Sequence, residues 1–174
     1  MIRKVLVLNL LLLISSCFSN KIREIKDFSF EKLIVNENIS QVNSSFLEGI
    51  DPKDFKEFLL KNNFINSNDP NEFIFNETEA NFRVIIDSKE KIQKIEFYSY
   101  SEVSPLKKAQ TFFKQASKIP IPQVDTLRIK KWTEANMKLI NEKFSRATIL
   151  SNIHYIIEQI DPNEFRLTIK KYNN

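Results

Sequence analysis

The sequence predicts an α+β domain with an antiparallel sheet of about five strands and about three helices packed on one face of the sheet. Short runs in which apolar and polar residues alternate, such as 82–86 and 153–157, have the period of half-buried strands. Two helix starts that contain proline, at 51–52 and 104–105, precede apolar residues with helical spacing. The 174 residues, of which 42% are apolar, suffice for one domain with its own core.

The first elements of the domain are expected to be a core segment and a helix. Residues 28–35 are apolar enough to enter the core, either as a first strand or as a docking segment. Asp51 is suited to cap a helix that begins at Pro52, because its carboxylate can accept the free N–H groups of the first turn. One face of this helix would carry Phe55, Phe58 and Leu59.

An antiparallel meander is expected after this helix. Residues 73–75 form one short apolar run, and alternation at 82–86 and at 95–97 predicts two further strands. The connection 88–91 has the length of a hairpin loop, so the last two strands are expected to pair.

Two helices are predicted after the meander. The first begins at Ser104-Pro105 and ends before 119–122, where two prolines remove the N–H groups that a helix needs. The second is expected over 125–144. Its buried residues would be Ile129, Trp132, Leu139 and Ile140.

The last predicted element is a hairpin, whose turn belongs to a repeated pentapeptide. Its strands are expected at 153–157 and 165–169. The sequence DPNEF stands at 69–73 and again at 161–165, and the related DPKDF stands at 51–55. Asp, Pro and Asn in this order are typical of turns. Turn chemistry therefore explains the repeat, and the alternative is an internal duplication.

The N-terminal residues have the pattern of a secretion signal. Arg3 and Lys4 precede an apolar run at 5–14, which as a helix would be about 15 Å long, or half of a bilayer's apolar core. The run ends in Ile14-Ser15-Ser16-Cys17. This segment resembles the lipobox of bacterial lipoproteins, in which an aliphatic residue and two small residues precede an acceptor cysteine. The mature domain resembles no family that we recognise.

The lipobox resemblance implies how the precursor is processed and where it is located. Signal peptidase II would cut between Ser16 and Cys17, and the Cys17 thiol would carry a diacylglycerol. The chain would then consist of a signal peptide at 1–16, an acylated cysteine and tether at 17–27, and one α+β domain at 28–174. Phe18 stands where this family has an aspartate for inner-membrane retention. We therefore expect the cell envelope, and the outer membrane in a bacterium with two membranes.

Composition argues against several classes of function. Gly49 is the only glycine, so phosphate-binding loops and nucleophile elbows that need several glycines cannot be formed. Cys17 is the only cysteine, so disulfides and multi-cysteine metal sites are not expected. The formal charge of +4 falls to +2 without Arg3 and Lys4, which gives no support for a nucleic-acid partner. No cofactor or metal is expected.

A few polar residues are candidates for chemistry. His154, the only histidine, and Glu158 share one face of the predicted strand and could form a base and its orienting partner. Glu77 and Glu79 form a carboxylate pair in a predicted loop. For His154 the alternative is a structural or surface histidine, and for the carboxylate pair it is solvation of a turn and protection of a sheet edge.

The two central helices carry a concentration of lysines, which are candidate contacts for an anionic surface. Anionic lipid head groups or envelope polymers would be the partners, and a solvated helix face is the alternative. The candidate residues are Lys107, Lys108, Lys114, Lys130, Lys131 and Lys138.

Taken together, the sequence predicts a lipid-anchored envelope module that is not an enzyme and that binds a protein, a lipid or an envelope polymer. The membrane itself would be one partner, through the acyl chains on Cys17. Two alternatives remain open at this point. One is a small periplasmic hydrolase that uses His154 or the acidic pair of Glu77 and Glu79. The other is a protective antagonist, of the immunity type, of a toxin or lytic enzyme.

Overall fold

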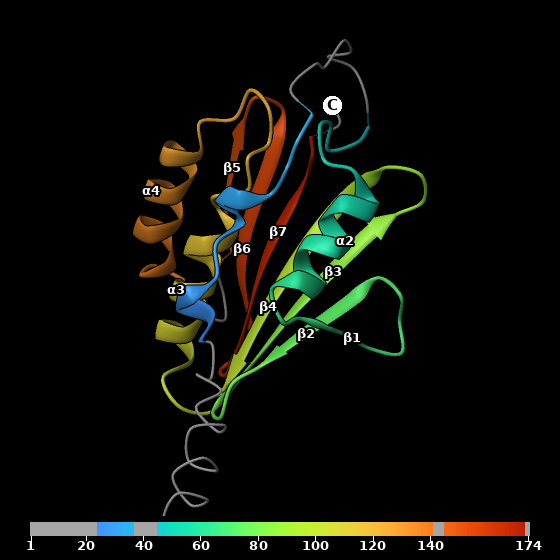
Figure 1. The fold of residues 1–174 in the computed structure, drawn as a ribbon. Helices are drawn as coiled ribbons and strands as arrows, with labels where there is room; N and C mark the ends of the chain where they lie inside the picture. Colours follow the sequence, from blue (N-terminus) through green and yellow to red (C-terminus); the bar gives the residue numbers. More distant parts are fainter. Residues whose placement is uncertain (1–23, 37–44, 141–144, 173–174) are drawn as a thin grey trace, which may run out of the picture.

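The fold is known from a computed structural model, which describes residues 24–36, 45–140 and 145–172. One antiparallel sheet dominates it, with the strand order β1-β2-β3-β4-β7-β6-β5 (Figure 1). The strands are β1 (Ile65–Asn66), β2 (Glu72–Asn76), β3 (Ala80–Ser88), β4 (Ile92–Ser101), β5 (Arg146–Leu150), β6 (Ile153–Asp161) and β7 (Glu164–Lys171). The helices within the described residues are η1 (Ile25–Asp27), η2 (Phe30–Lys32), α2 (Pro52–Lys61), α3 (Pro105–Ala116) and α4 (Thr126–Met137).

The α+β class and the antiparallel sheet are confirmed, but the predicted number of strands is too low. The described residues contain seven strands rather than about five, and β1 and β5 were missed. β1 has only two residues, which is too short to show a period. β5 is an edge strand in which Ile149 is exposed, so its apolar residues do not mark a core face. The helices also exceed the expected three when η1 and η2 are included.

The helix starts follow the predicted capping chemistry only in part. The Asp51 carboxylate accepts the N–H groups of the first turn of α2, and Asp125 caps α4 in the same way. Ser104 precedes α3 without a side-chain cap, in the left-handed region with φ of 56°. The predicted end of α4 at 144 is wrong, because the helix ends at Met137 and leaves Leu139 exposed beyond it.

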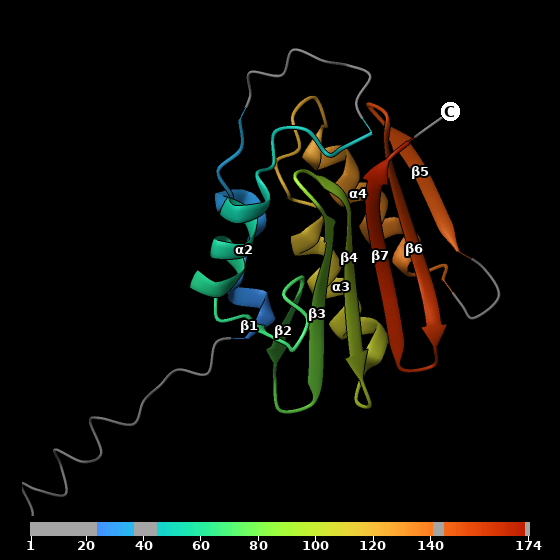
Figure 2. The same cartoon turned by 90° about the vertical axis from the view of Figure 1, so that its right-hand side faces the viewer.

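Residues 28–35 were expected to form either a first strand or a docking segment. They form a docking segment and not a strand. Phe28 and Leu33 are buried around η2, and the ring of Phe30 is completely buried. Ile25 is buried as well, so the last residues of the expected tether already lie on the domain. The helices α3 and α4 cover one face of the sheet (Figure 2). The opposite face carries no helix among the described residues.

Phenylalanine rings connect the layers of the core. Phe30 lies between Phe55 of α2 and Phe97 of β4, at ring distances of 5.9 and 5.4 Å. Phe112 of α3 contacts Phe97 at 5.8 Å and Phe82 of β3 at 5.0 Å. The N-terminal segment, two helices and the sheet are therefore joined through one aromatic cluster.

Both copies of the DPNEF pentapeptide are turns that lead into a strand. The Asp69 carboxylate accepts the N–H of Asn71 at 2.8 Å, and the Asp161 carboxylate accepts the N–H of Asn163 at 2.7 Å. The strands β2 and β7 follow directly. The local geometry of the repeat is the geometry of turn chemistry.

Candidate functional site

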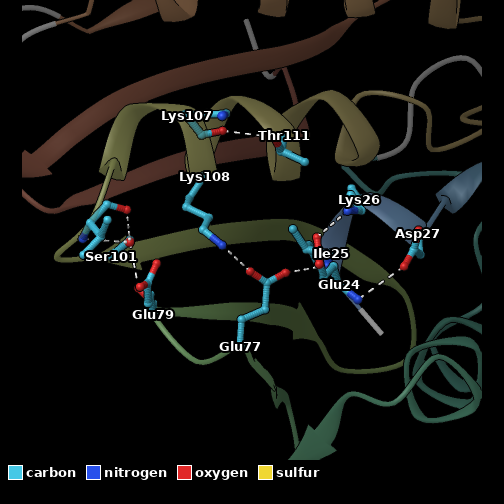
Figure 3. A network of polar contacts seen from close by, with 11 residues as sticks. Glu24, Ile25, Lys26, Asp27, Glu77, Glu79, Ser101, Lys107, Lys108 and Thr111 are labelled. Atoms are coloured by element: carbon cyan, nitrogen blue, oxygen red, sulfur yellow. Dashed lines mark hydrogen bonds and ion pairs between the residues drawn. The ribbon is translucent and has the colours of Figure 1, made fainter. Parts of the chain in front are cut away.

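The N-terminal segment is fastened to the domain through Glu77, in the turn between β2 and β3. One carboxylate oxygen of Glu77 accepts the N–H of Ile25 at 2.5 Å, and the other lies 2.6 Å from Nζ of Lys108 in α3 (Figure 3). The Glu77 side chain is only 6% exposed. We call Ile25, Glu77 and Lys108 the N-terminal clasp. It joins three parts of the chain at the point where the segment after Cys17 enters the fold.

The loop from β4 to α3 is held beside the clasp by Ser101. Its hydroxyl lies 2.7 Å from the carbonyl oxygens of both Glu79 and Val103, and it accepts the N–H of Val103. Ser101 itself is fully buried. The loop backbone is therefore fixed, while the Val103 side chain remains 50% exposed.

A shallow pocket of about 350 Å³ lies next to the β2–β3 turn, and Glu77 and Glu79 are among the residues that line it. The two carboxylates have different surroundings, because Glu77 is bound within the clasp while Glu79 is exposed. Acid–base work on a glycoside needs two carboxyl groups that face one substrate. The clasp already occupies both oxygens of Glu77, so this pair does not offer that arrangement.

His154 and Glu158 lie on the same uncovered face of β6, but the structure does not bring them together. One residue, Ile156, lies between them along that face, and the strand rise places them about 13 Å apart. Glu158 accepts two hydrogen bonds from Arg166, at 2.7 and 3.0 Å. The His154 ring lies edge-on to Tyr172 and opposite Lys170. Partial burial, and secondly the charge of Lys170, lower the pKa of His154 below its usual value.

An arginine–tyrosine cluster occupies the centre of the uncovered face and was missed by sequence reasoning. The guanidinium groups of Arg83 and Arg166 lie 4.7 and 5.8 Å from the centre of the Tyr98 ring. Arg83 is paired with Glu164 at 2.6 Å. Although burial alone would lower it, hydrogen bonds to Tyr98 and Glu158 raise the pKa of Arg166 above its usual value. Strand alternation indicated a polar face, but the cluster depends on the register of three strands.

The predicted basic surface on α3 and α4 is partly neutralised. Lys108 is bound in the clasp, and Lys114 is paired with Glu134 of α4 at 3.0 Å. Lys118 is likewise paired with Glu31 of η2 at 3.1 Å. Only part of the sequence-based lysine surface is therefore available for an outside partner.

The outward side of α4 retains its positive charge. Ile129, Thr133 and Met137 face the core, so the residues between them face solvent. The exposed stripe consists of Leu127, Arg128, Lys131, Ala135 and Lys138. It has three cations and no carboxylate, and we call it the α4 stripe.

Comparisons with known proteins found no relative. No protein-family model, no curated protein and no solved structure matches the chain. Ser16 and Cys17 lie outside the described residues. Within the described part of the chain, none of the helices has both the length and the apolar character needed to cross a bilayer. The same residues contain no group of three or more histidine, cysteine or acidic side chains placed to hold a metal ion.

Proposed function

We propose that this protein is a lipid-anchored module of the bacterial envelope that is not an enzyme and that contacts anionic lipid head groups through the α4 stripe. The lipobox pattern at 14–17 supports the anchor, with acyl chains on Cys17. Two or three acyl chains, at about 0.8 kcal/mol for each buried CH₂, would hold the domain on a membrane permanently. In a bacterium with two membranes the outer membrane is the proposed location.

The observation that carries the lipid contact is the charge of the α4 stripe. Arg128, Lys131 and Lys138 lie on one side of the helix, and the neighbouring Glu134 carboxylate is turned to Lys114 of α3. A basic side chain near an anionic bilayer contributes about 1 kcal/mol of attraction. Because the domain is already tethered, this attraction needs only to orient it.

The hydrolase alternative has little support from the geometry. A catalytic histidine needs an orienting partner and a nucleophile within hydrogen-bond reach. The Glu158 carboxylate is bound to Arg166 instead, and the His154 ring lies edge-on to Tyr172.

Protein binding, including the role of an antagonist, is the second candidate function. The uncovered sheet face supports it, because arginine and tyrosine are enriched where proteins bind one another. Arg83, Tyr98 and Arg166 are half-exposed at its centre. This face is opposite the helices, so an α4 contact with lipid would leave it accessible to a partner (Figure 2).

Anchoring is tested by metabolic labelling with a radioactive fatty acid. The wild-type protein is expected to incorporate label, and Cys17→Ala is expected to incorporate none. Label that persists in Cys17→Ala would contradict the proposed anchor.

The lipid contact is tested on the acylated protein in vesicles by its reactivity toward an amine-acetylating reagent. In vesicles with anionic lipid, Lys131 and Lys138 are expected to react several-fold more slowly than in zwitterionic vesicles, and added salt should restore their reactivity. Lys61 on α2, whose side chain is 75% exposed, is the internal control and should react equally in both. Equal reactivity of Lys131 in the two lipids would exclude this contact.

A further inference from the structure

The attachment of the N-terminal segment determines which end of the domain is nearest to the proposed lipid anchor. Ile25 is buried and bound to Glu77, so the chain leaves the domain at the clasp. Seven residue steps separate Cys17 from Glu24, and fully extended they span at most about 25 Å. The clasp end of the domain therefore stays within that distance of the membrane surface.

An exposed apolar loop lies at this same end. The residues between β4 and α3 precede Lys108 by about one helical turn, and Lys108 is part of the clasp. Val103 of this loop is 50% exposed, and Leu106 in the first turn of α3 is 37% exposed. Figure 1 shows this loop at the lower end of α3, on the helical side of the sheet.

Hydrogen bonds fix the conformation of this loop, in which Val103 is exposed. The buried hydroxyl of Ser101 is hydrogen-bonded to both the carbonyl oxygen and the N–H of Val103. The following residue, Ser104, takes a left-handed conformation with φ of 56°, which a non-glycine residue adopts at a cost. A fixed backbone loses little conformational entropy on binding. Transfer of the exposed apolar side chains into an apolar environment therefore carries a small entropic cost.

From these observations we infer that the β4–α3 loop is seated in the membrane interface, with Val103 and Leu106 in contact with lipid. This rests on the proposed acyl anchor. The tether supplies a bilayer within reach, and burial of the two side chains is favourable by the hydrophobic effect. The neighbouring Lys107 is exposed and can remain at the level of the phosphates.

The charges around the loop determine what kind of lipid contact is expected. Glu79 and Glu102 are exposed beside it, and anionic lipid would repel them. The contact of Val103 and Leu106 should therefore be apolar, and anionic lipid should not strengthen it. In this respect it differs from the contact proposed for the α4 stripe.

The test uses spin labels on the acylated protein in zwitterionic vesicles. Acylation blocks the thiol of Cys17, so one new cysteine gives one labelling site. The test positions are Val103→Cys and Leu106→Cys, and the controls are Leu60→Cys on α2 and Ile149→Cys on β5, where the native side chains are 49% and 45% exposed. Collision with oxygen, which enters lipid, is compared with collision with a water-soluble nickel chelate.

At both test positions we expect collisions with the nickel chelate to be several-fold rarer than at the controls, and collisions with oxygen more frequent. Adding anionic lipid should not increase this protection. Labels at 103 and 106 that are as accessible to the chelate as those at 60 and 149 would overturn the inference. If the wild-type protein does not float with vesicles, the acyl anchor itself is contradicted. The two failures are therefore distinguishable.

Discussion

Glu77 in the β2–β3 turn lies 2.6 Å from Lys108 of α3, and its second oxygen accepts the N–H of Ile25. With a side chain only 6% exposed, Glu77 is the residue through which the N-terminal segment is bound to both the sheet and the helix. At this position the clasp would transmit the restraint of the proposed lipid anchor to the folded domain.

We expect Glu77→Gln to weaken the clasp while preserving its shape. The amide oxygen can still accept the N–H of Ile25, but the ion pair with Lys108 is lost, and a broken charge-assisted bond costs about 1–3 kcal/mol. The free energy of unfolding in urea should fall by that amount. Hydrogen exchange at the Ile25 amide should accelerate more than exchange in the sheet.

Glu79→Gln is the matched control, because it makes the same change of charge two residues away. The Glu79 side chain is exposed, and its contact with Ser101 uses the backbone carbonyl. Its unfolding free energy should stay within about 0.5 kcal/mol of wild type. Equal destabilisation by both variants would show that only net charge matters and not the clasp.

Gly49→Ala should be strongly destabilising. Gly49 has φ of +83°, and an added Cβ would lie 2.5 Å from Cγ of Pro122 and 2.8 Å from the carbonyl oxygen of Asn36. The left-handed backbone alone costs an alanine about 1–2 kcal/mol, and the displaced neighbours add to it. Thermal unfolding should shift down by several degrees. Glu48→Ala, one residue earlier, should change the unfolding temperature little, and an unchanged temperature for Gly49→Ala would contradict the close contact.

His154 should make the protein less stable as the pH falls below about 6.5. Burial and Lys170 lower the pKa of His154 in the folded state, so the unfolded chain binds the proton more readily. Stability therefore rises with pH through the interval between the folded pKa and about 6.5, and is constant above it as far as this residue is concerned.

Urea unfolding at pH 5 and pH 7.5 measures this effect, with His154→Gln as the comparison. Subtraction of the two proteins removes the contribution of the carboxylates, and the variant should lose less stability on acidification. Lys170→Met should raise the pKa of His154 toward its usual value in an NMR titration. A pKa above 6.5 in the wild-type protein would reverse the predicted sign.

Sequence reasoning recovered the elements whose signals are local. The alternation of Phe82, Val84 and Ile86 predicted β3, and the capping chemistry of Asp51 predicted the start of α2. It failed where the local signal was absent, as in the two residues of β1. It also failed at the end of α4, since the apolar residues beyond Met137 suggested a longer helix.

For the candidate sites too, local features were predicted from the sequence, and contacts between distant residues were not. The lysines on α3 and α4 were visible in the sequence, but the neutralisation of Lys108 depends on Glu77, 31 residues away. The sequence placed His154 and Glu158 on one face of a strand. The register of β6 against β7 places Glu158 opposite Arg166 and not beside His154. Similarly, Tyr98 lies between two arginines only because β3 and β7 pair on opposite sides of β4.

By itself the sequence determined the α+β class and, among the elements of the described residues, five of the seven strands and the starts of the three α-helices. It also carries the lipobox pattern from which the anchor at Cys17 is proposed. These features depend on side-chain periodicity and on motifs a few residues long. Only the tertiary structure decided which charges are paired, where Ile25 is fastened and which face of α4 remains basic. The reason is physical, because ion pairs and strand registers join residues far apart in the chain, and only packing of the whole core brings those residues together.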